Sequence, residues 1–148
     1  MAANEDILTS IRSLLLLWDE LTDIVDDRIR PDAFHSTDEN LPTLMLEVTD
    51  GTQLNVLDRT AAIVDCTLNI TVRAPLAVQA AQIAEIIRSR GDDPSTGLDG
   101  YTGSAGSGTL LSAERQSFSN GKEIDQNGDE TANYLSIQVY QLLFKIGG

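Results

Sequence analysis

The sequence has few basic residues, a single cysteine and a single histidine. Ten Lys and Arg stand against 23 Asp and Glu, which gives a net charge of −13 at pH 7. Because phosphate binding requires a basic surface, this imbalance argues against a nucleic-acid-binding protein and against adhesion to anionic membranes. One cysteine excludes an internal disulfide framework and any cysteine-rich zinc site.

Long hydrophobic runs are also lacking. The longest uninterrupted apolar run, Leu14–Trp18, is far shorter than a membrane span. Glu5 and Asp6 lie where a signal peptide would be basic. The hydrophobic content of 41% is nevertheless enough for a core. We therefore expect one acidic, soluble globular domain over residues 1–148, with no membrane partner.

An amphipathic helix is predicted to begin at Asn4, a good capping residue, and to end before Pro31. Its apolar residues recur at alternating spacings of four and three, which places them on one stripe facing a core. These residues are Ile7, Ile11, Leu14, Trp18, Leu21 and Val25.

Leu16 falls on the opposite face of this helix, together with Arg12 and Asp19. Leaving a leucine in water costs about 1.5–3 kcal/mol relative to burying it. Leu16 is therefore a candidate self-association residue, although single exposed leucines are common and a loop could cover it.

Strand patterns follow. Alternation of period two begins at Thr43, Asp50-Gly51 predicts a hairpin turn, and Leu54 and Val56 mark the return strand. The clearest alternation covers residues 64–72. It buries one face and leaves the other wet, and its buried residues are Val64, Cys66, Leu68, Ile70 and Val72.

A second helix is predicted after Pro75, with Gly91 as its stop, and two further strands over Thr109–Ser119 and Asn133–Ile146. The last strand is apolar on both faces near its end, so it is either central or covered by a partner. Leu142 and Phe144 are therefore further candidate interface residues. The predicted fold class is α/β (α+β), a mixed and largely antiparallel sheet with two packed helices.

Two loops are singled out by composition. Residues 91–108 hold six of the eleven glycines, which predicts a long mobile loop that is functional or disordered. Residues 120–130 form an acidic hairpin loop whose carboxylates are Glu123, Asp125, Asp129 and Glu130. The loop does not fit a calcium-binding EF-hand, because its glycine is fourth rather than sixth.

Catalysis has no positive support in the sequence. His35, the one histidine, lies in an irregular polar segment, and Cys66 lies on a buried strand face. The glycines of 103–108 resemble a phosphate loop, but no lysine follows and the next segment is predicted as a strand. Arg90-Gly91-Asp92 matches an adhesion tripeptide, but these residues are explained by the end of the second helix. We expect no catalytic residue, cofactor or metal, and thus no enzyme.

One family resemblance covers nearly the whole chain. An N-terminal amphipathic helix, a short polar stretch and a strand–helix–loop–two-strand order resemble the tail-completion and tail-terminator proteins of long-tailed bacteriophages. The short motifs that carry the resemblance are Asp27-Arg28-Ile29-Arg30-Pro31 and Leu41-Pro42. The glycine-rich segment 91–108 departs from the family pattern.

The resemblance implies an α/β fold and a homo-hexameric ring that caps the tail tube and joins it to the head connector. It implies no enzymatic activity and no cofactor, and a location at the tail–neck junction of a virion assembled in the host cytoplasm. Acidic loops facing a central channel would let DNA pass without specific binding. The candidate channel-facing loop is 120–130, with Glu123, Asp125, Asp129 and Glu130. The alternatives are a head-closure or neck protein, a small ligand-binding module, and a hydrolase using His35.

Overall fold

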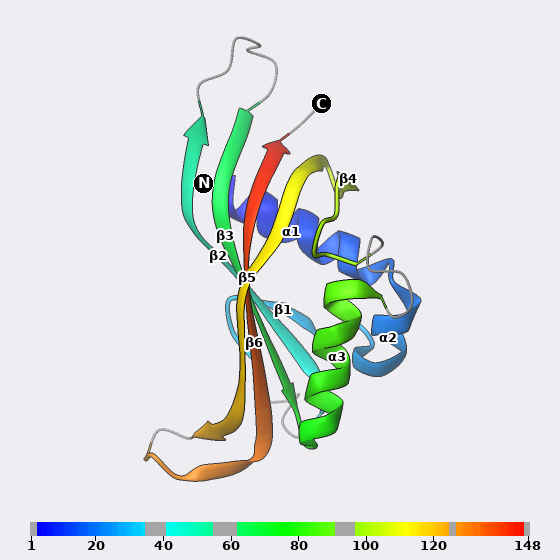
Figure 1. The fold of residues 1–148 in the computed structure, drawn as a ribbon, viewed down its shortest axis with the longest axis vertical. Coiled ribbons are helices and arrows are strands. Elements are labelled where there is room, and N and C mark those ends of the chain that lie inside the picture. Colours follow the sequence, from blue (N-terminus) through cyan, green and yellow to red (C-terminus); the bar gives the residue numbers. More distant parts are fainter. Residues whose placement is uncertain (1–2, 35–40, 55–61, 91–96, 125–126, 147–148) are drawn as a thin grey trace.

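The protein is described by a computed structural model that covers residues 3–34, 41–54, 62–90, 97–124 and 127–146. These residues form three helices and a sheet of six strands, in two layers (Figure 1). The helices are α1 (Ala3–Leu16), α2 (Asp19–Val25) and α3 (Ala77–Ser89). The strands are β1 (Ile29–Pro31), β2 (Thr43–Leu54), β3 (Ala62–Ala74), β4 (Gly103–Ala105), β5 (Gly108–Ile124) and β6 (Glu130–Ile146).

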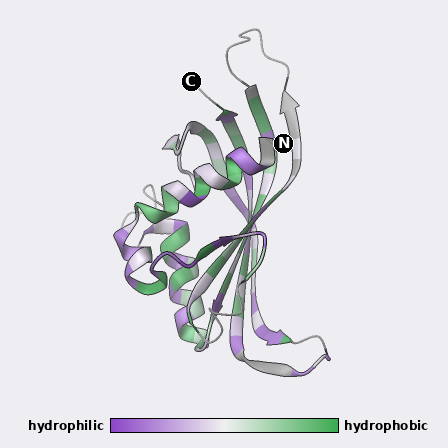
Figure 2. Ribbon diagram, turned by 180° about the vertical axis from the view of Figure 1, so that it is seen from behind, coloured by the Kyte–Doolittle hydropathy of each residue, from purple (hydrophilic) through white to green (hydrophobic). Residues whose placement is uncertain are grey.

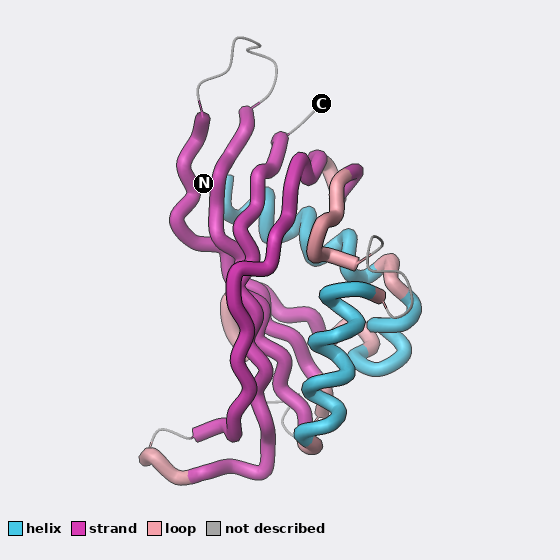
Figure 3. Tube along the Cα trace, viewed as in Figure 1, coloured by secondary structure: helices cyan, strands magenta, loops and turns pink. Residues whose placement is uncertain are grey.

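The strand order across the sheet is β1-β2-β3-β6-β5-β4. Only β1 and β2 run parallel, and the four other neighbouring pairs are antiparallel. The strands twist so strongly that the sheet is seen edge-on at its waist, with the helices gathered on one side (Figure 3). The predicted fold class, a mixed and largely antiparallel sheet with packed helices, is confirmed.

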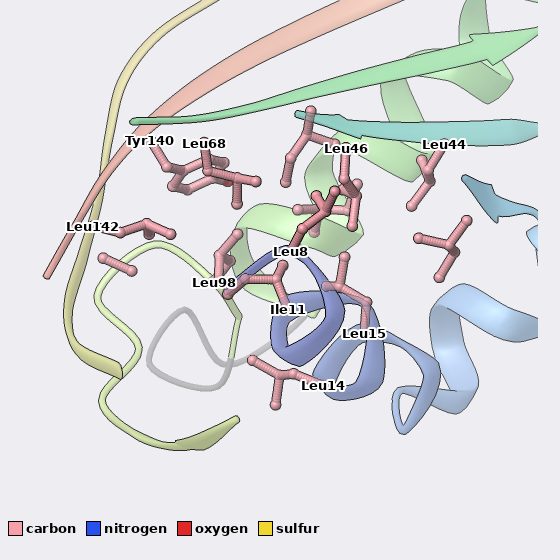
Figure 4. Close-up of a cluster of buried hydrophobic side chains, with 14 of the residues drawn as sticks. Leu8, Ile11, Leu14, Leu15, Leu44, Leu46, Leu68, Leu98, Tyr140 and Leu142 are labelled. Atoms are coloured by element: carbon pink, nitrogen blue, oxygen red, sulfur yellow. The ribbon is translucent and has the colours of Figure 1, made fainter. Parts of the chain in front are cut away.

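The core lies between the helices and one sheet face. Leu8, Ile11 and Leu15 of α1 point toward Leu46 and Leu68 of the sheet (Figure 4). All six residues of the predicted helical stripe are buried, as are all five residues predicted on the inner face of β3. The hydropathy colouring shows the same pattern of green positions along both layers (Figure 2). Periodicity therefore identified the core side of both elements correctly.

The predicted first helix is wrong in its continuity. It breaks at Leu17 and Trp18, whose N–H groups donate to the C=O groups of Leu14 and Leu15 at 3.1 Å, and Trp18 has an extended backbone (ψ 103°). The break lets the Trp18 side chain stay buried while Leu17 is 74% exposed. Past Val25 the chain forms the edge strand β1 instead of a helix end, because Ile29 is fully buried beside Leu44.

The predicted hairpin turn at Asp50-Gly51 is also wrong. β2 continues through these residues, and the register with β3 shifts by one extra residue between Thr49 and Thr52, which is a β-bulge. The chain reverses after Leu54, and Val56 lies outside the described residues. The Asp-Gly pair therefore bends the strand instead of ending it.

The glycine-rich segment is partly packed, contrary to the predicted structureless loop. Its first part lies outside the described residues, but Leu98 is fully buried and β4 pairs with the start of β5. A Cβ on Gly108 would lie 2.6 Å from Lys145 O and 2.7 Å from Phe144 Cζ. Glycine is required there because backbone and ring approach too closely for a side chain.

Candidate assembly surfaces

The candidate interface residues lie in different environments. Leu142 and Phe144 are each 1% exposed and belong to the core, because β6 is central in the sheet and these residues face the helix layer. The expectation that these two residues form an interface is therefore wrong. The last strand is apolar on both faces because it is central in the sheet, and not because a partner covers it. Leu16 is half-buried and packs against the core.

The exposed leucine of the first helical region is Leu17 and not Leu16, the leucine that helical periodicity predicts. The 100° periodicity of an unbroken helix placed Leu16 farthest from the core, and the break at Leu17–Trp18 moves that position by one residue. Only the geometry of the break distinguishes the two leucines, because their neighbours in the sequence are similar.

The acidic candidates are also divided. Glu123 lies within β5 and is half-buried, not in a loop. Asp125 lies outside the described residues, Glu130 begins β6, and Asp129 is exposed near the end of the β5–β6 hairpin. The two strands continue the ladder as far as Ile124 and Glu130, so the predicted loop over 120–130 is much shorter than expected.

Glu123 instead belongs to a polar cluster on the sheet face away from the helices. Its carboxylate accepts a hydrogen bond from Asn133 Nδ2 at 3.2 Å and lies 3.7 Å from Arg73 Nη1. The Arg73 guanidinium also lies 4.2 Å from the ring centre of Phe34. Arg73 is 8% exposed, and a buried charge needs such partners. The cluster ties the segment after β1 to β3, β5 and β6.

The β5–β6 hairpin forms an arm that extends past α3 at the lower end of the molecule (Figure 1). Six consecutive residues of β5 along this arm, Ser117–Lys122, are all exposed, and so is Ile124. Phe118 is 51% exposed and carries the Arg115 guanidinium 4.7 Å from its ring centre. The arm is the main candidate surface, because it is exposed on both faces and carries two exposed apolar side chains, Phe118 and Ile124.

A cavity of about 270 Å³ lies beside the arm. It is lined by Ala77 and Ala80 of α3 and by strand residues of the arm, namely Asn120, Gly121, Lys122, Tyr134 and Leu135. Its walls are predominantly apolar, and Lys122 Nζ lies 5.2 Å from the Tyr134 ring centre. The cavity is large enough for one apolar side chain and adjoins the exposed edge of β5.

A second cavity, of about 400 Å³, lies between α1 and β1 and is lined by Leu8, Thr9, Arg12, Ser13, Ile29, Arg30 and Pro31. Arg12 closes the strand edge there, because its Nε donates to Ile29 O at 2.6 Å. The alternative of a small ligand-binding module predicts an enclosed pocket near residues 91–108. Neither of these two cavities is lined by a residue of 97–108, the described part of that segment.

The two residues considered for catalysis are His35 and Cys66. His35 lies outside the described residues. Cys66 is fully buried, and burial raises the pKa of its thiol to about 11, so it is not a nucleophile at neutral pH. Within the described parts of the chain, His, Cys, Asp and Glu form no group of three or more that could hold a metal ion. The helices described there are too short or too polar to cross a membrane.

Comparison with solved structures finds a likeness of fold. The fold matches a chain in a solved structure described as the virion of a native gene transfer agent particle, with a TM-score of 0.54, 15% identity, and 84% of each chain covered. No protein-family model matches the sequence. No curated protein matches it either. The chain therefore shares its fold, over most of its length, with a component of that particle.

Proposed function

We propose that the protein is a structural component of a phage-type virion, and that it acts as the tail terminator. In this role a ring of six copies caps the tail tube, stops its polymerisation and joins it to the head connector. The observation that carries the proposal is the fold shared over 84% of the chain with a component of the gene transfer agent virion. The resemblance of the sequence to tail-terminator proteins supplies the finer assignment.

The surface of the protomer supports an assembly role. The β5–β6 arm leaves Ser117–Lys122 exposed on both faces, and Leu17 is exposed at the opposite, N-terminal part of the chain. A ring requires a heterologous interface, in which one patch meets a different patch of the neighbour. The exposed apolar side chains of Phe118 and Leu17 lie in separate parts of the chain, which fits that requirement. As a ring subunit of this kind, the protein would not be an enzyme.

The charge of the chain supports passage of DNA without retention. The net charge is −13, and the exposed Asp129 lies near the end of the arm. Acidic groups around a channel repel phosphates, so a genome would slide through the ring without specific binding. A ring structure whose bore is neutral or basic would contradict this part of the proposal.

A head-closure or neck protein is the other candidate role at the same joint. The two roles differ in the partner that the ring binds. The test mixes the purified protein with isolated tail tubes and, separately, with isolated head connectors, followed by sedimentation. The proposal expects co-sedimentation with tubes and arrest of tube growth at a fixed length. Binding to connectors alone would assign the neck role, and a protein indifferent to both would contradict a virion role.

A further inference from the structure

The outer edge of β5 is protected at its beginning and open further along. Gly100 N donates to Ala113 O at 2.7 Å, and Arg115 N donates to Asp99 Oδ1 at 3.1 Å. From Phe118 to Lys122, no hydrogen bond links the backbone of this edge to another residue that the structure describes. β4 contacts β5 only at Gly108–Leu110.

The backbone direction along this open edge follows from the ladder. The backbone C=O of Ala113 and the backbone N–H of Arg115 point outward, away from β6. The bulge between Arg115 and Ser117 adds one residue to β5. Because outward and inward residues alternate in an antiparallel strand, the N–H and C=O groups of Phe118, Asn120 and Lys122 point away from β6. Ser117–Lys122 contains no proline and one charge, so the usual protections of an exposed edge strand are largely missing.

The cavity between α3 and the arm adds a pocket to this edge. Asn120 and Lys122, whose backbone groups point outward, line the cavity together with Ala77 and Ala80. A strand that pairs with the edge would lie next to the cavity and could place one apolar side chain in it. Hydrogen bonds to an open edge with an adjoining side-chain pocket are the arrangement by which proteins bind an added strand.

The chain itself supplies a second open edge, on β2. Among the described residues, the last backbone hydrogen bond on the outer side of β2 is at Leu46. Its C=O accepts from Asp32 N at 2.8 Å. Among the described strands, β3 alone pairs with β2 from Val48 to Leu54. β2 and β5 run antiparallel to each other, because the three ladders that connect them are all antiparallel. Two copies in the same orientation can therefore join these edges as an antiparallel pair, as cyclic symmetry requires.

We propose that the β5 edge at Ser117–Lys122 pairs with the β2 edge at Val48–Leu54 of a second copy, so that neighbouring sheets join around the ring. The inference rests on the proposed function, since it defines the contact between ring subunits. In this arrangement the β5–β6 arm contacts the neighbouring subunit of the ring, and the tube and the connector bind other surfaces.

The test compares paired variants by the mass of the assembly. Asn120→Pro removes an outward N–H at an edge position where proline is tolerated in the protomer, whereas Asn120→Ala changes the side chain and keeps that N–H. Ala77→Trp fills the cavity without altering β5. Ala81→Trp, at an exposed position of the same helix that does not line the cavity, is its control. Circular dichroism and thermal unfolding establish that each variant is folded.

We expect Asn120→Pro and Ala77→Trp to remain monomeric where the wild type, Asn120→Ala and Ala81→Trp form rings. In the wild-type ring, the amides of Phe118, Asn120 and Lys122 should exchange at least about tenfold more slowly than in the monomer. Rings formed equally by the folded Asn120→Pro and Ala77→Trp variants would overturn the edge pairing and leave the proposed function intact. Protection of these amides only after tail tubes are added would assign the edge to the tube protein instead. A wild type that forms no ring, alone or on tubes, would overturn both.

Discussion

Replacing Gly108 with alanine should destabilise the protein, although the residue lies in a segment whose composition predicts a mobile loop. An added Cβ would lie 2.6 Å from Lys145 O and 2.7 Å from Phe144 Cζ, well inside van der Waals contact. Phe144 is 1% exposed and held in the core, so its ring cannot move aside without disturbing its neighbours. Overpacking of this kind costs about 1–3 kcal/mol.

For a chain of this length, that cost corresponds to a fall in Tm of roughly 2–12 °C. The matched control is Gly121→Ala in the same strand, because a Cβ there has no neighbour within 4 Å. Differential scanning calorimetry at one protein concentration measures both. We expect a lower Tm for Gly108→Ala and an unchanged or slightly higher Tm for Gly121→Ala. Equal Tm values for the two variants would refute the close packing of Gly108.

Three further predictions concern the helix break and the buried polar groups. Leu16→Asp should lower the free energy of unfolding by about 2–4 kcal/mol in urea, because Leu16 packs against the core. Leu17→Asp should stay within about 0.5 kcal/mol of wild type, because Leu17 is exposed. The reverse order of the two variants would contradict the helix break between them. Tyr140→Phe should cost about 1–3 kcal/mol in the same assay, since it leaves the buried Gln138 Oε1 without its hydroxyl donor; no loss of stability would contradict that hydrogen bond. Because burial raises the pKa of Cys66 to about 11, a thiol reagent at pH 8 should label the unfolded chain but not the native one; labelling of native protein would contradict the burial.

Periodicity predicted the elements that are buried on one side. The stripe from Ile7 to Val25 and the alternation from Val64 to Val72 both mark core faces correctly, because burial of one face fixes the side-chain period. α3 begins near Pro75, as expected, and ends at Ser89. Local pattern was sufficient for the core face of each element, but not for the break between α1 and α2.

Elements whose conformation depends on distant contacts were not predictable in this way. β1 forms because β2 lies beside it, since Arg28 O accepts from Leu44 N at 2.9 Å across the parallel ladder. β4 and the packing of Leu98 depend on β5 and α3, and Leu98 N donates to Ile87 O at 2.8 Å. Glycine composition alone cannot distinguish close packing at Gly108 from a mobile loop.

The candidate surface could be located only once the order of strands in the sheet was known. The sequence left two explanations for the apolar end of the last strand, and only the position of β6 between β3 and β5 shows that Leu142 and Phe144 are core residues. The arm carries a mixed polar sequence that gives no interface signal. Its importance follows from exposure on both faces and from an unpaired edge, which are properties of the tertiary structure.

The mass of the assembly tests the central claim most directly. The purified protein, alone and after addition of isolated tail tubes, is analysed by native mass spectrometry and by electron microscopy of the tube ends. We expect a ring of six copies of 16.0 kDa each, about 96 kDa, seated on one end of the tube. A protein that remains a 16.0 kDa monomer in the presence of tubes, with bare tube ends, would contradict it.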